Sequence, residues 1–370
     1  MTDKPIKLLK QSNKIDFWII LLTLFFGLFG ILMIYEASNI SAFKDLADKY
    51  HSVKDQAIWF SIGLIALIIT SHISYKRLNK IPVLVLIFTI IALIGVFIPG
   101  IGIKSYGAHR WIGLGGLNFQ PSELAKLSLI IYLSCWLSSS KEKGRFIAFL
   151  FLLSLTVGLI ILQPDLGTAI IITNIFISMY FLSGAKFWHF LLILPLSLIM
   201  IALLAILSPY RFTRIVTFFN PNIDPLGASY HIQQILISLG SGGFWGLGLG
   251  SSIQKYQFLP EATTDSIFAI IGEEFGFIGA VAIIILFIIF IYRLILVAKN
   301  APDKQSYLLS GGICTLFASQ TVINLGSMVT LFPLTGVPLT FLSYGGSNLI
   351  IAFIAIGIIL NISRYSIKKS

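Results

Sequence analysis

Apolar runs of about twenty residues recur along the whole chain, and they limit its fold more than any other feature. About twenty apolar residues in a helix cross the roughly 30 Å of hydrocarbon in a bilayer. Hydrophobic residues make up 56% of the 370 residues, and charged residues 11%. Lipid offers no partners to backbone polar groups, so such runs must pair those groups internally, as helices do. The sequence therefore predicts an all-α polytopic membrane protein.

Ten runs are predicted to span the membrane. The first run, 17–35, is longer than the core of a signal peptide and lacks a small-residue cleavage site, so it is predicted to be retained. The approximate limits of the ten spans are 16–36, 56–73, 81–99, 121–138, 146–162, 166–183, 188–207, 266–292, 307–332 and 346–362.

Basic residues predict the orientation of these spans. If the tail 1–15 is cytoplasmic, the inside segments hold 17 Lys and Arg, the outside segments hold 8, and Lys126 lies within a span, which accounts for all 26. Both termini are therefore predicted to be cytoplasmic. A large loop, 208–265, between the seventh and eighth spans is predicted to lie outside, within a single membrane domain, 1–370. The net charge of +11 then reports topology and attraction to anionic lipid, not nucleic-acid binding.

Several common catalytic and metal-binding patterns are missing from the sequence. The five histidines are scattered, without an HExxH or a Cys/His zinc spacing, and no GxSxG elbow occurs. Both cysteines fall in apolar segments, where they pack as small side chains. The glycine-rich stretch 240–250 lacks the Gly-Lys-Ser/Thr of a phosphate loop. Two interpretations of it are open: a flexible or close-packed re-entrant loop, or a lid over a bound lipid.

Charged residues within the spans, or at their ends, are better candidates for function. Glu123 and Lys126 stand three apart in the fourth span, so their opposite charges share one helical face and can pair. An unpaired charge at mid-membrane costs at least about 2.5–3.5 kcal/mol. A structural ion pair and a role in substrate handling are both open. Asp165 follows Pro164 at the start of a span and is predicted to cap that helix.

Arginines that follow the seventh span also allow two interpretations. Arg211 and Arg214 can anchor the chain at the interface, or they can bind a phosphate through two N–H donors each. Arg110 and Lys255 are predicted to lie on the same outer side.

The segment 256–276 concentrates acids in a chain that has few of them, with Glu261, Asp265, Glu273 and Glu274 close together. Acids are costly where a loop re-enters apolar sequence unless they are needed. Glu261 and Asp265 are four apart, on one face if the segment is helical. A carboxylate near basic groups is what transfer from a phosphorylated leaving group requires, because the reaction needs one base and charge stabilisation for the departing oxygen.

Five ordered motifs carry a resemblance to a known family. They read HRWIGLGGLNFQPSELAKL, QPDLGTA, NPNIDPLGASYHIQQILISLGSGGFWGLGLG, LPEATTDSIFAIIGEEFGFIGA and LFPLTGVPLTFLSYGGSNLI. From about residue 100 onward the chain resembles the SEDS proteins, the RodA and FtsW peptidoglycan glycosyltransferases, whose ten-span layout also fits. The usual EAHTDFIFA of that family reads EATTDSIFA here, with Thr263 for His and Ser266 for Phe. The late motif has Thr340 for the common Pro and Asn348 for the common Ser.

The resemblance implies polymerisation of lipid II on the outer face of the bacterial cytoplasmic membrane. A sugar hydroxyl of one lipid-linked unit attacks the anomeric carbon of another and expels undecaprenyl pyrophosphate. It implies that Asp265 is the catalytic base and that Glu123 and Lys126 are the family's paired acid and lysine. The implied partner is a class B penicillin-binding protein, with other divisome or elongasome proteins. LPEATTD…GEEFG is closer to FtsW and PLTGVPL to RodA, and we favour the division type. A divalent cation fits pyrophosphate chemistry, but the sequence names no site for one.

One base acting by direct displacement predicts inversion of the donor anomer. The candidates for steadying the pyrophosphate are Arg211, Arg214, Lys255 and Arg110. A retaining enzyme usually needs a second carboxylate as nucleophile, and Glu261 is the lower-ranked candidate for that role. Two other functions stay open: a lipid II flippase with Glu123 and Lys126 lining its path, or a scaffold that recruits division enzymes.

Overall fold

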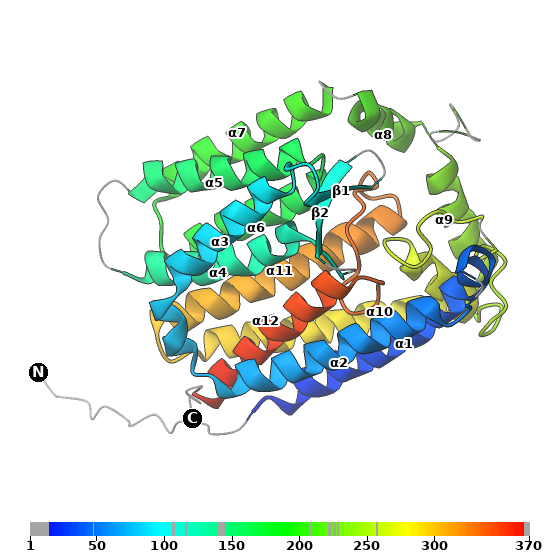
Figure 1. Ribbon diagram of the computed structural model, residues 1–370, viewed down its shortest axis with the longest axis horizontal. Helices are drawn as coiled ribbons and strands as arrows, with labels where there is room; N and C mark the ends of the chain where they lie inside the picture. The colour runs from blue at the N-terminus through cyan, green and yellow to red at the C-terminus, as the bar shows by residue number, and fades with distance from the viewer. Residues whose placement is uncertain are drawn as a thin grey trace, which may run out of the picture.

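The computed structural model describes residues 15–365 except 47, 106–107, 115–116, 140–144, 207–208, 221–223, 225–226, 228 and 257. Long helices dominate the described chain and lie roughly side by side (Figure 1). The helices are α1 Phe17–Leu46, α2 His51–His72, η1 Tyr75–Lys80, α3 Pro82–Gly95, α4 Pro121–Ser138, α5 Arg145–Leu162, α6 Leu166–Leu182, α7 Phe187–Ile206, α8 Pro209–Phe219, α9 Tyr230–Ser241, α10 Ile267–Lys299, α11 Lys304–Met328 and α12 Gly346–Arg364.

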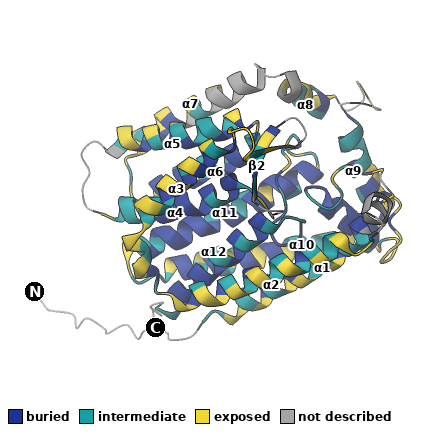
Figure 2. Cartoon of the chain, in the orientation of Figure 1, coloured by how far each residue is buried: buried dark blue, intermediate teal, exposed yellow. Residues whose placement is uncertain are grey.

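The centre of the bundle is formed by α4, α6, α11 and α12, which are mostly dark blue in Figure 2. α12 packs along α2 and is the most enclosed of the long apolar helices, with 83% of its apolar window buried against 17% for α2. The outer helices turn large apolar side chains outward, and Ile65, Phe88, Phe151, Trp188 and Ile288 are each more than half exposed. An apolar outer surface of this extent is typical of a protein that lies in a membrane.

Five helices of the described chain are long and apolar enough to cross a membrane: Phe17–Ser38 within α1, α2, α10, α11 and α12. Shorter apolar helices occur at 82–95, 146–162, 166–182 and 187–197. Each of the ten predicted spans overlaps one helix, which supports the helical architecture. The number of ten membrane crossings itself stays a prediction.

The expectation of an all-α fold is wrong for the described residues between 102 and 119. They form an antiparallel sheet in the order β1 (Gly102–Ser105), β2 (Ala108–Leu114) and β3 (Leu117–Phe119). Gly102 pairs with Ile112, which in turn pairs with Phe119 on the other side. Hydropathy separates spans from loops, but short strands are held by hydrogen bonds between strands, and no strong alternation signals them here. The sheet leads directly into α4.

Helix starts follow local sequence signals. Pro121 occupies the first turn of α4, where its missing N–H costs nothing. Asp165 caps α6, because its Oδ1 accepts a hydrogen bond from the Thr168 backbone N–H at 3.0 Å, and this confirms the predicted cap. Asp303 forms a capping box with Ser306 at the start of α11.

The glycine-rich stretch 240–250 packs against a break in α10. The break is at Gly276, whose φ of 69° lies outside the helical region. There the Phe277 backbone N–H donates to the Gly243 carbonyl at 2.8 Å, so the loop supplies a partner that the broken helix lacks. A Cβ on Gly246 would lie 2.2 Å from the Glu274 carbonyl oxygen. Of the two interpretations of this stretch, a close-packed loop fits this contact with α10.

The predicted loop 208–265 contains two helices, α8 and α9. They lie at the right of Figure 1, whereas α1 begins and α12 ends toward the left. These two helices thus lie at one end of the bundle.

Candidate active site

Asp265 lies at the end of the loop that precedes α10, with 8% of its surface exposed. Its Oδ1 accepts a hydrogen bond from Thr264 Oγ1 at 3.2 Å. A Cβ on Gly336 would lie 3.9 Å from its Oδ2. Burial and the neighbouring Glu261 raise the pKa of Asp265 to about 6, and Arg214 opposes this shift. Asp265 is thus ionised at neutral pH and more basic than an ordinary aspartate.

The backbone of this loop is held by α11 and by the segment 337–344. Asn324 Nδ2 donates to the carbonyl oxygens of Asp265 and Val337, each at 2.8 Å. Ser343 Oγ donates to the Thr264 carbonyl at 2.5 Å. These hydrogen bonds fix the position of Asp265 through the main chain. They do not involve its carboxylate.

Glu261 and Asp265 share the hydroxyl of Thr264. Thr264 Oγ1 lies 2.7 Å from Glu261 Oε2 and 3.2 Å from Asp265 Oδ1. The residues between them form turns, and Glu261 has a φ of 52°, so the two acids do not share a helical face. Glu261 is exposed where Asp265 is buried. The two carboxylates therefore differ in environment although they lie close together.

Arg214 is the basic group whose charge reaches Asp265. It belongs to α8, is half-buried, and its Nη1 donates to the Leu334 carbonyl at 2.8 Å. The charge of Arg214 lowers the pKa values of both Asp265 and His231. Arg211 belongs to the same helix, but its side chain lies outside the described residues.

Arg110 comes from β2 and holds the turn between α5 and α6. Its Nε donates to the Gln163 carbonyl at 3.1 Å, and its Nη2 donates to the Pro164 carbonyl. The start of α6 in turn packs on the segment next to Asp265, since a Cβ on Gly167 would lie 2.9 Å from the Thr335 carbonyl oxygen. Segment 334–337 therefore contacts Arg214, the start of α6 and Asp265.

Lys255 is buried in a separate cluster of charges. Its Nζ lies 3.1 Å from Glu36 Oε2 and 3.4 Å from Glu274 Oε1, and it donates to the Gly250 carbonyl at 2.7 Å. Its ammonium group thus already has two carboxylate partners, one on α1 and one on α10. Its contact with pyrophosphate stays a prediction.

Glu123 and Lys126 form the ion pair that their spacing predicted. Lys126 Nζ lies 2.8 Å from both Oε1 and Oε2 of Glu123, and the two side chains are 2% and 4% exposed. Pairing of this kind is required for charges in the interior of a helical bundle. The geometry confirms the pair, while its use in substrate handling stays a prediction.

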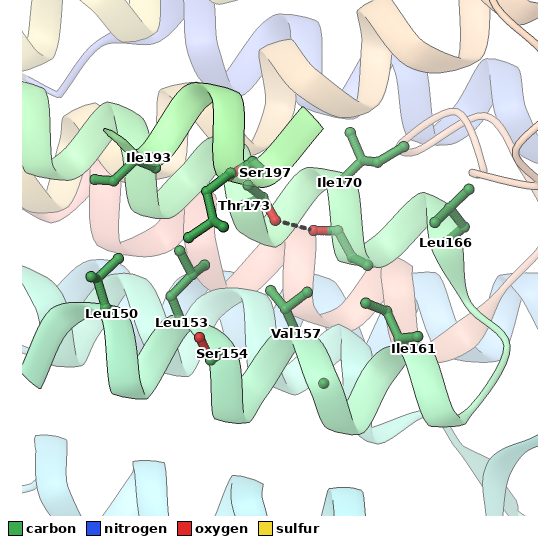
Figure 3. A pocket seen from close by; sticks show the side chains of 13 residues that line it. Leu150, Leu153, Ser154, Val157, Ile161, Leu166, Ile170, Thr173, Ile193 and Ser197 are labelled. Atoms are coloured by element: carbon green, nitrogen blue, oxygen red, sulfur yellow. Dashed lines mark hydrogen bonds between the residues drawn. The ribbon is translucent and has the colours of Figure 1, made fainter. Parts of the chain in front are cut away.

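An apolar cavity of about 150 Å³ lies between α5, α6 and α7 (Figure 3). None of its lining side chains is ionisable, so the cavity suits an apolar chain and cannot supply acid–base chemistry. It begins at Leu166, the residue after Asp165, at the end of α6 that packs on segment 334–337. The lining residues are Leu150, Leu153, Ser154, Val157, Gly158, Ile161, Leu166, Ala169, Ile170, Thr173, Ile193, Leu196 and Ser197.

Comparison with known proteins gives one family for nearly the whole chain. The family model described as FtsW/RodA/SpoVE, cell cycle protein, matches residues 16–368. The chain belongs to the FtsW/RodA/SpoVE family. It is 37% identical to stage V sporulation protein E of Bacillus subtilis, over 95% of this chain and 97% of that protein. It is 38% identical to the probable peptidoglycan glycosyltransferase FtsW of Trichlorobacter lovleyi, over 97% and 95%. The resemblance stated from the motifs is confirmed.

Solved structures agree with this membership of the FtsW/RodA/SpoVE family. The rod shape determining protein RodA of Thermus thermophilus has a TM-score of 0.71 at 26% identity, covering 96% of this chain and 98% of that one. A chain in a structure described as structural coordination of polymerization and crosslinking by a peptidoglycan synthase complex has a TM-score of 0.77 at 27% identity, covering 95% and 98%. The fold of this chain is therefore RodA-like.

Two residues of the site were missed from the sequence. Asn324 lies in an apolar run, and a polar amide in such a run is a signal of a buried polar contact. His231 was counted among scattered histidines, yet its Nε2 lies 2.7 Å from Ser266 Oγ, beside Asp265. For this FtsW/RodA/SpoVE protein, the site thus combines one buried carboxylate, one nearby arginine and neutral groups that hold the loop.

Proposed function

We propose that this protein is a peptidoglycan glycosyltransferase that polymerises lipid II, with Asp265 as its general base. The observation that carries the proposal is the buried Asp265 carboxylate with a pKa of about 6, fixed by its main chain beside Arg214. A general base works best when its pKa is near the working pH and it is still ionised. Membership of the FtsW/RodA/SpoVE family, and relatives that are named peptidoglycan glycosyltransferases, support this class of reaction.

The proposed step joins two lipid-linked disaccharide units. The acceptor hydroxyl oxygen forms a bond to the anomeric carbon of the donor as Asp265 takes the hydroxyl proton. The bond from that carbon to the pyrophosphate oxygen breaks, and the pyrophosphate leaves with the electron pair. One base and one displacement invert the anomer. Glu261 is the lower-ranked alternative as a nucleophile, because it is exposed and shares the Thr264 hydroxyl.

Charge on the leaving pyrophosphate needs cationic donors, and Arg214 is the best supported one. A guanidinium carries five N–H donors, so a bond to the Leu334 carbonyl is compatible with holding a phosphate oxygen. Arg110 holds the neighbouring turn before α6 and assists by fixing that wall of the site. Arg211 stays a candidate from the sequence. Among the described residues, no group of three or more His, Cys, Asp or Glu side chains could hold a metal ion, and we assign none.

The membrane setting supplies the substrate. The apolar cavity between α5, α6 and α7 suits part of an isoprenoid tail, because none of its lining side chains is ionisable. The cavity also begins next to the turn that Arg110 holds, near the candidate site. We propose that both termini are cytoplasmic and that α8, α9 and Asp265 lie at the outer face of the bacterial cytoplasmic membrane. In Figure 1 the start of α1 and the end of α12 lie away from α8 and α9, which supports opposite sides of the membrane for these two groups. The basic residues of the inside segments support it as well.

A crosslinking enzyme is the proposed partner. One structural neighbour comes from a complex described as coordinating polymerization and crosslinking. We propose a class B penicillin-binding protein in that role, in a division complex by preference over an elongation complex.

The decisive experiment uses purified protein in detergent, with its cognate penicillin-binding protein and labelled lipid II. The wild type should make glycan polymer, whereas Asp265→Asn should make none because its amide cannot take a proton. Asp48→Asn, at an exposed loop position paired with Lys54, is the matched control and should retain full activity.

A flippase cannot act in detergent, where no two leaflets exist, and a scaffold forms no bond. Absence of polymer from the wild type with its correct partner would therefore overturn the glycosyltransferase proposal. Polymer from a folded Asp265→Asn variant would keep the reaction and remove Asp265 as its base.

A further inference from the structure

His231 is a half-buried side chain near Asp265 that the proposed reaction does not use. It lies near the start of α9, and its Nε2 is 2.7 Å from Ser266 Oγ. Ser266 is fully buried, directly follows Asp265 and stands at the N-cap position of α10. The contact therefore joins α9 to α10 at the residue after the base.

The same imidazole has a second partner at the other end of this loop. It hydrogen-bonds the backbone of Pro260, and because proline has no N–H, the imidazole must donate to the carbonyl. Burial, and then the charge of Arg214, lower the pKa of His231 to about 4, so the ring is neutral at pH 7. A neutral imidazole has one donor and one acceptor. It therefore donates to Pro260 and accepts from Ser266.

We propose that His231 is a positioning residue for Asp265, joining the two ends of the segment 260–266 that carries the base. This inference rests on the proposed function of Asp265. Asn324 and Ser343 hold the same segment from α11 and from the segment after it, and His231 is the corresponding tie from α9. Three ties from different elements restrict how far Asp265 can move.

Charged groups near the His231–Ser266 contact come from α8, from the segment 260–266 and from α10. Arg214 on α8 faces the imidazole, and Glu261 and Asp265 belong to the segment that it joins. From α10, Glu273 reaches α9 two turns farther along, where Ser238 Oγ lies 3.3 Å from its Oε2. α11 contributes the neutral Asn324.

The contact depends on the side chain at position 266. Ser266 supplies the hydroxyl group that His231 contacts at 2.7 Å. A phenylalanine at position 266 would have no hydroxyl donor, so this hydrogen bond to His231 requires Ser266.

The test compares His231→Leu, which keeps bulk without hydrogen bonds, with His231→Gln, whose amide can still donate and accept. The measurements are kcat, KM for labelled lipid II and the pH–rate profile, with the penicillin-binding protein present. We expect His231→Leu to lower kcat about tenfold or more with little change in KM, since small displacements of a catalytic group cost up to about 10²-fold. His231→Gln should recover most of the loss.

The pH profile separates positioning from general damage. Loosening the segment admits water to Asp265, so the acid limb of the profile should move to lower pH in His231→Leu, toward an ordinary aspartate. A smaller amount of folded enzyme would scale the whole profile without moving its limb. Ser266→Ala should shift the limb in the same direction. His72→Gln, at an exposed position at the end of α2, is the control and should change nothing.

A stability cycle tests the same inference without activity. Asp265→Asn is expected to raise the melting temperature at pH 7.5, and this rise should shrink by half or more in the His231→Leu background. If the wild type makes no polymer, the proposed function fails and this cycle still decides the role of His231. An undiminished rise, or a His231→Leu enzyme with wild-type kcat and acid limb, would overturn the positioning role.

Discussion

Asn324 holds Asp265 by the main chain: its side-chain amide lies 2.8 Å from the Asp265 carbonyl oxygen and 2.8 Å from that of Val337. One fully buried side chain of α11 thus joins the loop before α10 to the segment before α12. The Asp265 carboxylate takes no part in this bond. It can therefore be held in place and still face a substrate.

Replacing Asn324 by Ala should impair both stability and activity. The change leaves two buried carbonyl groups without a donor, which costs about 1–3 kcal/mol for each group. Thermal unfolding in detergent and polymer yield measure the two effects. Asn361→Ala is the matched control, because Asn361 is equally buried and bonds Ser71 and Tyr75 elsewhere in the bundle. It should lose stability but keep the wild-type rate per folded enzyme, and an equal loss of rate would contradict a specific role for Asn324.

The rate of polymerisation should fall as the pH drops through about 6, the pKa of Asp265. The carboxylate must be ionised to take a proton, so kcat/KM should fall about tenfold for each pH unit below that value. A pH series with labelled lipid II and the penicillin-binding protein measures the limb. A profile that stays flat down to pH 4.5 would contradict a base in this environment.

Removing the charge of Asp265 should stabilise the protein at neutral pH. Its folded pKa of about 6 is above the ordinary 3.8, so protonation favours the folded state. Its contribution is therefore most favourable below about 4 and is lost as the pH rises through about 6. Asp265→Asn should raise the free energy of unfolding at pH 7.5 by up to about 3 kcal/mol. Melting curves at pH 4 and pH 7.5 should show a gain for the variant at the higher pH alone.

The Glu123–Lys126 pair allows its two interpretations to be separated. Glu123→Gln leaves the Lys126 ammonium buried without a counter-charge and should cost about 3–5 kcal/mol. The double variant Glu123→Leu with Lys126→Met removes both charges and should recover much of that stability. Polymer from the stable double variant would assign the pair to structure, and loss of polymer would assign it to substrate handling. A Glu123→Gln protein as stable as wild type would contradict the buried ion pair.

Gly246 should be intolerant of a side chain. Its φ is 82°, and an added Cβ would lie 2.2 Å from the Glu274 carbonyl oxygen at the break in α10. The left-handed backbone alone costs about 1–2 kcal/mol for alanine, and the clash adds to it. Gly240→Ala is the control, because nothing lies within 4 Å of a Cβ there and the residue is helical. Melting temperatures should fall for the first variant and hold or rise for the second.

Local sequence rules predicted the features that depend on near neighbours. Asp165 caps α6 through Thr168, three residues on, and Lys126 pairs with Glu123 at helical spacing. The same rules missed the sheet at 102–119, whose strands carry no long apolar or alternating run. They also grouped Lys255 with the outer arginines by position along the chain, whereas its partner Glu36 comes from α1.

By itself the sequence determined that this chain is helical and apolar on its outside, since runs of about twenty apolar residues need lipid and internal hydrogen bonds. Its motifs also determined the family and singled out Asp265. Tertiary structure alone decided what surrounds that residue. Asn324 comes from 59 positions away in the chain, and His231 meets Ser266 across 35 positions. No local periodicity encodes contacts over such distances, because they arise only when α9, α10 and α11 pack together.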